Sequence, residues 1–341
     1  MEIDVHEVTE DRADLVDALT EVRNDTITDV SPDDPAAPAA EVASELFNRT
    51  THVHTRSWVA FVDGTPAGEA TFDLEDDDEN RHIAGSDWFA VRHRVRRRGV
   101  ADALLRTVLD ACAAEGRTTL HLWSPVLEPD VGHAYASRLG LTPALEERCS
   151  RLAMTDLPEP LIVDWLSAGR DRSDGYRIVQ FGGRCPDELL PPFLEAIAAM
   201  DDMPTDELEW TVARTDEELV RSREHNWERR RLVLARTLAL APDGAGAGFS
   251  ELFVCTHRPT LAYQGDTGVV PTHRGRGLGR WLKAENLRYA QRVAAGFEVI
   301  ETHNAQSNPW MLDINVAMGF RPHVVYRAYQ GDLAAARAVL G

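Results

Sequence analysis

The chain has 341 residues, and its 56 acidic against 36 basic side chains give a formal net charge of −20. With 43% hydrophobic and 27% charged residues its composition is typical of a globular protein, and its length favours two domains. Nucleic acids and anionic membranes repel so acidic a chain, so we expect neither as a partner. Lys283 is the only lysine, so all the other basic side chains are arginines.

The sequence indicates neither export nor membrane insertion. No stretch approaches the roughly 18 apolar residues of a membrane span, and the acidic N-terminal segment lacks the basic and apolar regions of a signal peptide. The four cysteines form no CxxC pair, which excludes a zinc knuckle or a thioredoxin-like motif. We therefore expect a cytoplasmic protein with buried free thiols.

In the first half of the chain, short strands precede an arginine-rich loop and a helix. Strands are predicted at residues 2–8, 57–62, 67–74, 88–91 and 120–123. Asp63 and Gly64 lie between the second and third strands and predict a two-residue hairpin turn. Apolar residues recur at helical spacing from Val100 to Cys112, and a short helix is expected to end at Gly140.

Two histidines in this half raise the question of a metal site. His52 and His54 alternate, which would place both side chains on one face of a strand. Two ligands without a third nearby carboxylate or cysteine do not complete a metal site, so we interpret them as a solvated pair. No metal cofactor is expected.

The second half of the chain repeats the order of the first. Strands are predicted at residues 176–181, 232–241, 249–255, 262–270 and 299–303, and helices at 187–200, 216–231, 278–293 and after Asn308. Residues 155–173 contain two prolines and an apolar patch, which we interpret as a linker that partly packs.

Self-similarity between the halves supports a duplication. Arg96 aligns with Arg274 at an offset of 178, and Gly140 aligns with Gly319 at an offset of 179. One register held over more than 40 residues, with a single slip of one residue, predicts two copies of one domain. The predicted organisation is an N-terminal domain at 1–155, a linker at 156–174 and a C-terminal domain at 175–341.

A glycine-rich loop at 274–279 lies between a predicted strand and a predicted helix. Glycine lets backbone N–H groups turn toward an anion, and the helix N-terminus and the nearby arginines add positive charge. A Walker A loop is excluded because Lys283 lies too far along and is not followed by Ser or Thr. A Rossmann fingerprint is excluded because Arg280 stands where its last glycine would be.

The loop reads RxxGxG after the fourth strand and opens a long helix, which resembles the acetyl-CoA loop of the GNAT (Gcn-five-related) acetyltransferases. Residues 269–271 resemble the V-x-P that precedes the loop in this family, and Asn304, Asn308 and 319–320 resemble its second half. The resemblance covers essentially all of residues 175–341 and, more faintly, 1–155. It implies a mixed α/β (α+β) fold of two tandem GNAT-like domains, each a twisted, mostly antiparallel sheet flanked by helices.

The resemblance also implies acetyl-CoA as co-substrate and the residues that would hold it. Backbone groups of Val269 and Val270 would pair with the pantetheine arm, and the loop N–H groups would cradle the pyrophosphate. Asn304 and Asn308 would touch the cofactor arm, although helix capping alone would justify an asparagine at 308. The expected cofactor-binding residues are Val269, Val270, Arg274, Gly275, Arg276, Gly277, Leu278, Gly279, Arg280, Asn304 and Asn308.

Both copies depart from the family pattern. The family commonly has a tyrosine four residues before the downstream glycine, where this chain has Asn315 in the second copy and Ala136 in the first. The first copy has Pro129 where the second has Asn308. We interpret the first copy as a degenerate partner domain that retains a possible second cofactor site. That site comprises Arg96, Arg97, Arg98, Gly99, Val100 and Ala101.

These features predict an N-acetyltransferase whose C-terminal domain transfers acetyl from acetyl-CoA to a small-molecule or peptide amine. Attack would be direct, because the loop and the strand before it contain no cysteine. Asp266 is the candidate base or water-positioning carboxylate, or else a strand-end carboxylate that anchors the loop. The amide of Asn315 would hydrogen-bond the departing sulfur. The protein is expected to be a monomer or homodimer.

Two other functions remain open at this point. A non-catalytic CoA-binding or scaffolding protein is compatible with the missing tyrosine. A mycothiol-synthase-like tandem acetyltransferase is the other alternative, and Asn315 in place of tyrosine counts against it.

Overall fold

The chain folds into two compact units in this computed structural model, which describes residues 1–47, 50–212 and 214–341. The first unit comprises Met1–Glu146, Thr205–Thr211 and Val324–Gly341. The second unit comprises Glu147–Pro204 and Val212–His323.

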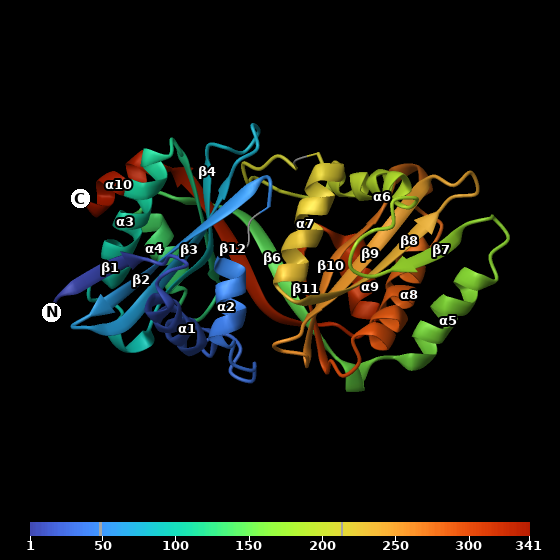
Figure 1. Cartoon of the computed structure of the whole chain (residues 1–341), viewed down its shortest axis with the longest axis horizontal. Coiled ribbons are helices and arrows are strands. Elements are labelled where there is room, and N and C mark those ends of the chain that lie inside the picture. Colours follow the sequence, from blue (N-terminus) through green and yellow to red (C-terminus); the bar gives the residue numbers. More distant parts are fainter. Residues whose placement is uncertain (48–49, 213) are drawn as a thin grey trace. The chain divides into compact units, whose positions relative to one another are not determined.

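The first unit contains one sheet with helices against it (Figure 1). Its elements are β1 (Ile3–Glu7), α1 (Ala13–Ile27), α2 (Ala39–Leu46), β2 (Val53–Val62), β3 (Thr65–Glu75), β4 (Ile83–Val91), α3 (Val100–Ala114), β5 (Thr119–Pro125), α4 (Val131–Arg138), most of β12 (Arg321–Asp332) and α10 (Leu333–Leu340). The strands follow the order β1-β2-β3-β4-β5-β12. All neighbours are antiparallel except β4 and β5, which are parallel.

The second unit repeats this topology. Its elements are most of β6 (Thr142–Ala153), α5 (Glu159–Arg170), β7 (Arg177–Phe181), α6 (Leu190–Ile197), α7 (Glu217–Arg229), β8 (Leu232–Leu240), β9 (Gly246–Cys255), β10 (Leu261–Val269), α8 (Leu278–Val293), β11 (Val299–Ala305) and α9 (Pro309–Ala317). The order β7-β8-β9-β10-β11-β6 contains one parallel pair, β10 with β11. The predicted tandem α/β architecture is therefore confirmed.

The two units exchange their last strands. Strand β12, from the end of the chain, pairs with β5 of the first unit, and β6 pairs with β11 of the second. The compact units therefore differ from the ranges 1–155 and 175–341 that the sequence suggests. Pattern analysis places a strand in the copy where it occurs, whereas its pairing partner decides the unit in which it is buried.

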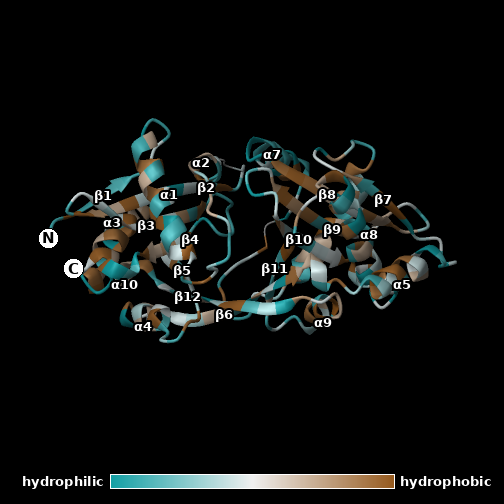
Figure 2. Cartoon of the chain, turned by 90° about the horizontal axis from the view of Figure 1, so that it is seen from below, coloured by the Kyte–Doolittle hydropathy of each residue, from teal (hydrophilic) through white to brown (hydrophobic). Residues whose placement is uncertain are grey.

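Each face of the second sheet carries its own hydrophobic core. On one face, Leu252 and Ile300 pack with Leu287 of α8. On the other face, Phe249 packs with Phe193 of α6. Figure 2 shows α7 as mostly hydrophilic beside the hydrophobic strands β8 and β9, as expected for a helix that covers the sheet at its surface.

The segment at 156–174 is more ordered than a linker. It forms α5, whose Ile162 and Leu166 are buried in the core of the second unit. The prolines at 158 and 160 stand at the start of this helix, where proline is tolerated. The sequence prediction of partial packing is thus correct, and the segment belongs to the second unit.

Candidate active site

The loop at 274–279 has the backbone that its glycines suggest. Gly275 and Gly277 both have φ of 75°, a conformation that other residues rarely adopt. Helix α8 begins at Leu278, and no side chain caps it. The N–H groups of its first turn therefore lack helical partners and point outward from a positive helix end, which is an anion site of the kind that fits a pyrophosphate.

The loop arginines divide into two roles. Arg274 donates through Nε to the carbonyl of Val269 at 2.9 Å and pairs with Asp202 at 3.0 Å, so it holds the loop against the end of β10. Arg276 and Arg280 remain exposed and lie over the rings of Tyr176 and Trp165, at 6.0 and 5.8 Å. Exposed guanidinium groups can donate to a phosphate, so these two stay the predicted phosphate ligands of the loop.

Strands β10 and β11 separate beside this loop. Among the described residues, their pairing covers only 261–263 with 299–301, and a bulge between Gln264 and Thr267 shifts β10 against β9. A bulge bends a strand, and beyond Tyr263 and Glu301 no described residues of β10 and β11 pair. We infer that the two parallel strands separate toward the loop, and we call this separation the opening. The predicted cofactor residues on β10 and β11 border this opening.

Only one of the two valines presents its backbone to the opening. Val270 donates its N–H to Ala247 and accepts a hydrogen bond from His273, so both of its backbone groups are engaged within the protein. Because backbone groups alternate along a strand, the N–H and the carbonyl of Val269 point the other way, toward β11. The carbonyl already accepts from Arg274, so the N–H is the backbone group of Val269 that is left for an added chain. Val269 is therefore the better placed of the two for an added chain.

Asp266 lies in the bulge, opposite Glu251 of β9, and its side chain is exposed. The protein packed around this carboxyl raises its pKa to about 6; Glu251 adds to the rise, and Arg223 opposes it. The backbone bulge keeps Asp266 at the surface while neighbouring protein atoms remove part of its solvent. A carboxylate with a pKa close to neutral can accept a proton from an amine through water. The role of Asp266 as the base stays a prediction.

The predicted asparagines form a chain that ends at a lysine. The Nδ2 of Asn315 donates to Oδ1 of Asn304 at 2.7 Å, and Lys283 Nζ donates to Oδ1 of Asn315 at 2.6 Å. Asn308 is separate: its Oδ1 accepts from the N–H of Met311 and caps α9. Sequence reasoning missed Lys283 as a site residue, although its being the only lysine was a usable signal.

The first unit builds its loop in the same way. Arg96 donates through Nε to the carbonyl of Val91 at 2.8 Å and pairs with Asp29. Gly99 has φ of 83°, but Arg97 occupies the other left-handed position, with φ of 63°. The first unit therefore retains the shape of the loop with a side chain where the second has Gly275.

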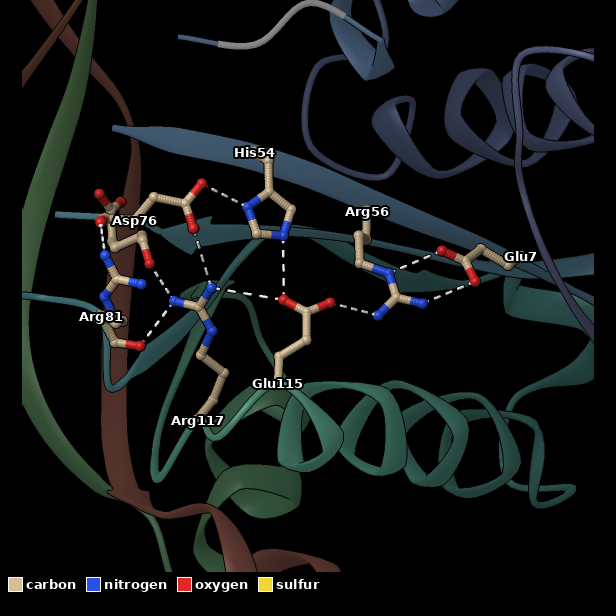
Figure 3. A network of polar contacts seen from close by, with 8 residues as sticks. Glu7, His54, Arg56, Asp76, Arg81, Glu115 and Arg117 are labelled. Carbon is tan, nitrogen blue, oxygen red and sulfur yellow. Dashed lines mark hydrogen bonds and ion pairs between the residues drawn. The ribbon is translucent and has the colours of Figure 1, made fainter. Parts of the chain in front are cut away.

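Two further clusters contain potential metal ligands. His54 contacts Asp76 through Nδ1 at 2.7 Å and Glu115 through Nε2 at 3.1 Å, inside the ion-pair network of Figure 3. The interpretation of His54 as solvated is therefore wrong, because carboxylates from two loops hold its ring. Loops that lie far from a strand in sequence could not be placed beside it from the pattern alone.

The second cluster brings Cys149, Glu301 and His303 together on neighbouring strands, with their ligand atoms within 4.8 Å of one another. Arg151 pairs with Glu301 at 2.6 Å. Burial raises the pKa of Glu301, but His303 and Arg151 outweigh this effect and hold it at about 2. The arginine supplies the positive charge that this carboxylate requires, which favours an ion-pair network over a metal.

Comparison with known families agrees with this geometry. The model of the acetyltransferase (GNAT) family matches residues 19–140 and, separately, 197–320. These matches span most of the chain, once in each half, so the chain belongs to the GNAT acetyltransferase family. Proteins of this family in general take acetyl from acetyl-CoA and act on small-molecule or peptide amines. The predicted family and enzyme class are confirmed at this level.

Particular relatives narrow the comparison. The mycothiol acetyltransferase of Mycobacterium avium (strain 104) is 32% identical over 213 residues. This match covers 60% of the present chain and 60% of the length of the M. avium protein. The mycothiol acetyltransferase of Mycobacterium marinum is 28% identical over 350 residues, covering 96% of this chain and 98% of that protein.

A solved structure shares the whole architecture. A tandem GNAT protein from the clavulanic acid biosynthesis pathway superposes with a TM-score of 0.80 over 97% of this chain and 99% of that chain, at 22% identity. This likeness shows the fold. In the part of the chain that the structure describes, no helix has the length and apolar character needed to cross a membrane.

Proposed function

We propose that the chain is an N-acetyltransferase whose second unit binds acetyl-CoA and passes the acetyl group to an amine. The observation that carries this proposal is the uncapped start of α8 behind two left-handed glycines, set beside the opening between β10 and β11. The first unit serves as a degenerate partner, because it lacks the second glycine and the asparagine chain.

The chemistry requires a base and a place for the departing sulfur. The amine must lose a proton as its nitrogen bonds to the acetyl carbon, and Asp266 would accept that proton through water. The carbon–sulfur bond then breaks, and the thiolate takes up a proton from solvent. Asn315 cannot supply a titrating proton. It is also buried, with its amide bonded to Lys283 and Asn304, so the hydrogen bond to the sulfur that the sequence suggests for Asn315 is not part of this proposal.

The acceptor has one specific candidate. The match to the M. marinum mycothiol acetyltransferase runs along nearly the full length of both chains. We therefore propose the amine that acetylation converts to mycothiol as the first acceptor to test, ahead of aminoglycosides, polyamines, amino acids and peptide N-termini. The departure at Asn315 favours keeping the panel broad. We place the reaction in the cytoplasm, with the protein a monomer or homodimer.

The test is release of free thiol from acetyl-CoA in the presence of each amine. Thiol release that depends on both acetyl-CoA and one amine, with the acetylated amine identified by mass, would support the proposal. Tight binding of acetyl-CoA with no release above the hydrolysis background for any amine would favour a non-catalytic CoA-binding protein.

A further inference from the structure

Lys283 lies in a place that is unusual for a lysine. It is the only lysine of the chain, it stands in α8 five residues after Leu278, and it is 1% exposed. Among the described residues, no ion pair includes it, and its ammonium lies 5.7 Å from the ring centre of Phe320. A buried cation without a carboxylate is costly, so its retention calls for a reason.

The chemistry of the site explains why the residue is not an arginine. Burial lowers the pKa of Lys283 to about 7. Lysine can therefore relieve its burial by losing a proton, whereas arginine remains charged. All the other cationic side chains of the Lys/Arg type are arginines, but at this buried position only lysine can donate a hydrogen bond and also become neutral.

Lys283 also fixes which way two amides point. While it is protonated, Lys283 has donors and no acceptor, so Asn315 turns its Oδ1 toward Nζ. The Nδ2 of Asn315 then faces Asn304, which accepts its hydrogen bond through Oδ1. The Nδ2 of Asn304 is left on the side away from Asn315.

The direction of the hydrogen bonds from Lys283 through Asn315 to Asn304 matters because of where Asn304 lies. Asn304 lies on β11 beyond Glu301, the last residue that pairs with β10, and so borders the opening. We propose that Lys283 is a positioning residue: it orients Asn315 and Asn304 so that Asn304 presents N–H donors to the acyl-pantetheine arm of acetyl-CoA. This inference rests on the proposed function, because it requires that arm to enter the opening.

The first unit supports the pairing of these residues in one role. At the same offset of 178, Lys283 corresponds to Leu105, and Asn315 corresponds to Ala136 at 179. Both counterparts are buried in the apolar core of the first unit. The fold therefore accepts apolar residues at both positions together, so stability alone does not require the polar pair.

Kinetics and calorimetry of Lys283→Met test the inference. Losing one charged hydrogen bond predicts a KM for acetyl-CoA and a Kd for CoA about 10–100-fold higher, with Tm unchanged or raised. The double variant with Asn315→Leu should bind no worse than Asn315→Leu alone. The matched control is Asn286→Ala, on the same helix as Lys283. It removes a buried hydrogen bond that Asn286 accepts from Thr237 of β8, and it should leave KM within about twofold.

The single lysine permits a second measurement on the wild-type chain. Lysine labelled with ¹³C at Cε gives one NMR resonance, which should shift when CoA is added. A wild-type chain that binds no acetyl-CoA would remove the proposed function itself. A wild-type chain that binds it, with an unmoved resonance or with Lys283→Met binding equally well, would overturn only the positioning role.

Discussion

The two units differ at the residues that a ligand would touch and agree at those that build the loop. In both, an arginine joins the end of the fourth strand to an aspartate: Arg96 with Asp29, and Arg274 with Asp202. Because both units have this arginine–aspartate contact, we interpret it as part of the structure of the loop. Arg274 therefore helps to build the loop in the second unit, and its predicted contact with a phosphate stays a prediction.

The differences cluster around the opening. The second unit has Gly275 where the first has Arg97, and it has the buried Lys283–Asn315 pair where the first is apolar. Beside the bulge of the first unit, Arg23 lies over Trp88 at 5.3 Å and pairs with the buried Glu69 at 3.2 Å. The second unit has a similar arrangement beside its own bulge, where the buried Arg236 pairs with Glu251 at 2.7 Å and with Glu224 at 2.8 Å. The two units therefore differ at the loop glycine and at the Lys283–Asn315 pair, and not in this ion pair.

The largest effect is expected at Asp266. Asp266→Asn should lower kcat by about 10²–10⁴-fold, the range for loss of a general base, with CoA affinity near wild type. The base must be unprotonated, so the wild-type rate should fall as pH drops through about 6, and the variant should lose this limb. The measurement is kcat against pH.

The first unit supplies the control for that experiment. Asp87 is the extra residue in its bulge and is also exposed. Asp87→Asn should leave kcat within about twofold, as for a surface substitution away from the site. Normal kcat with altered CoA binding in Asp266→Asn would instead make Asp266 a scaffold residue.

A smaller effect is expected on the pH dependence of stability, where a largely buried carboxyl in each unit acts with opposite sign. Burial raises the pKa of Glu75 in the first unit to about 8 from 4.5, and Asp77 and Asp73 add to the rise. The folded chain then holds a proton that the unfolded chain releases, so stability falls as pH rises from about 4.5 to 8. Glu75→Gln should therefore raise Tm at pH 8, by about 2–4 °C per kcal/mol gained, and not at pH 4.

In the second unit, Glu301 should change stability with pH in the opposite direction. The folded-state pKa of Glu301 is held at about 2, below its ordinary value, so its contribution is present at neutral pH and lost in acid. Glu301→Gln should lower Tm at pH 8 and approach wild type near pH 2. Calorimetric scans of both variants at the two ends of the pH range check these signs; equal shifts at both ends would contradict the assigned pKa values.

Local patterns were sufficient for much of the fold. Asp63 and Gly64 take φ of 48° and 77° in the hairpin turn that their sequence predicts. The repeat offset predicted the shared strand order, and the glycines predicted the loop conformation. Strands β6 and β12 were missed, because their burial depends on partners in the other half of the chain.

The candidate site was only partly predictable for the same reason. Glycine spacing is a local signal, so the loop residues were found. The partners of Arg274 and Asn315, which are Asp202 and Lys283, are 72 and 32 residues away in sequence. Hydrogen bonds across such separations exist only once the sheet has formed, and no spacing rule reports them.

The claim that the second unit, and not the first, binds acetyl-CoA is tested most directly by acetyl-CoA calorimetry on Gly277→Glu and Gly99→Glu. Both glycines have positive φ and hold the start of their helices, so the two changes impose the same strain and the same negative charge. The second unit is predicted to bind and react: Gly277→Glu should lose tight binding and turnover, and Gly99→Glu should keep both. Loss of the tight site in Gly99→Glu alone, with Gly277→Glu unaffected and both variants folded, would contradict this assignment.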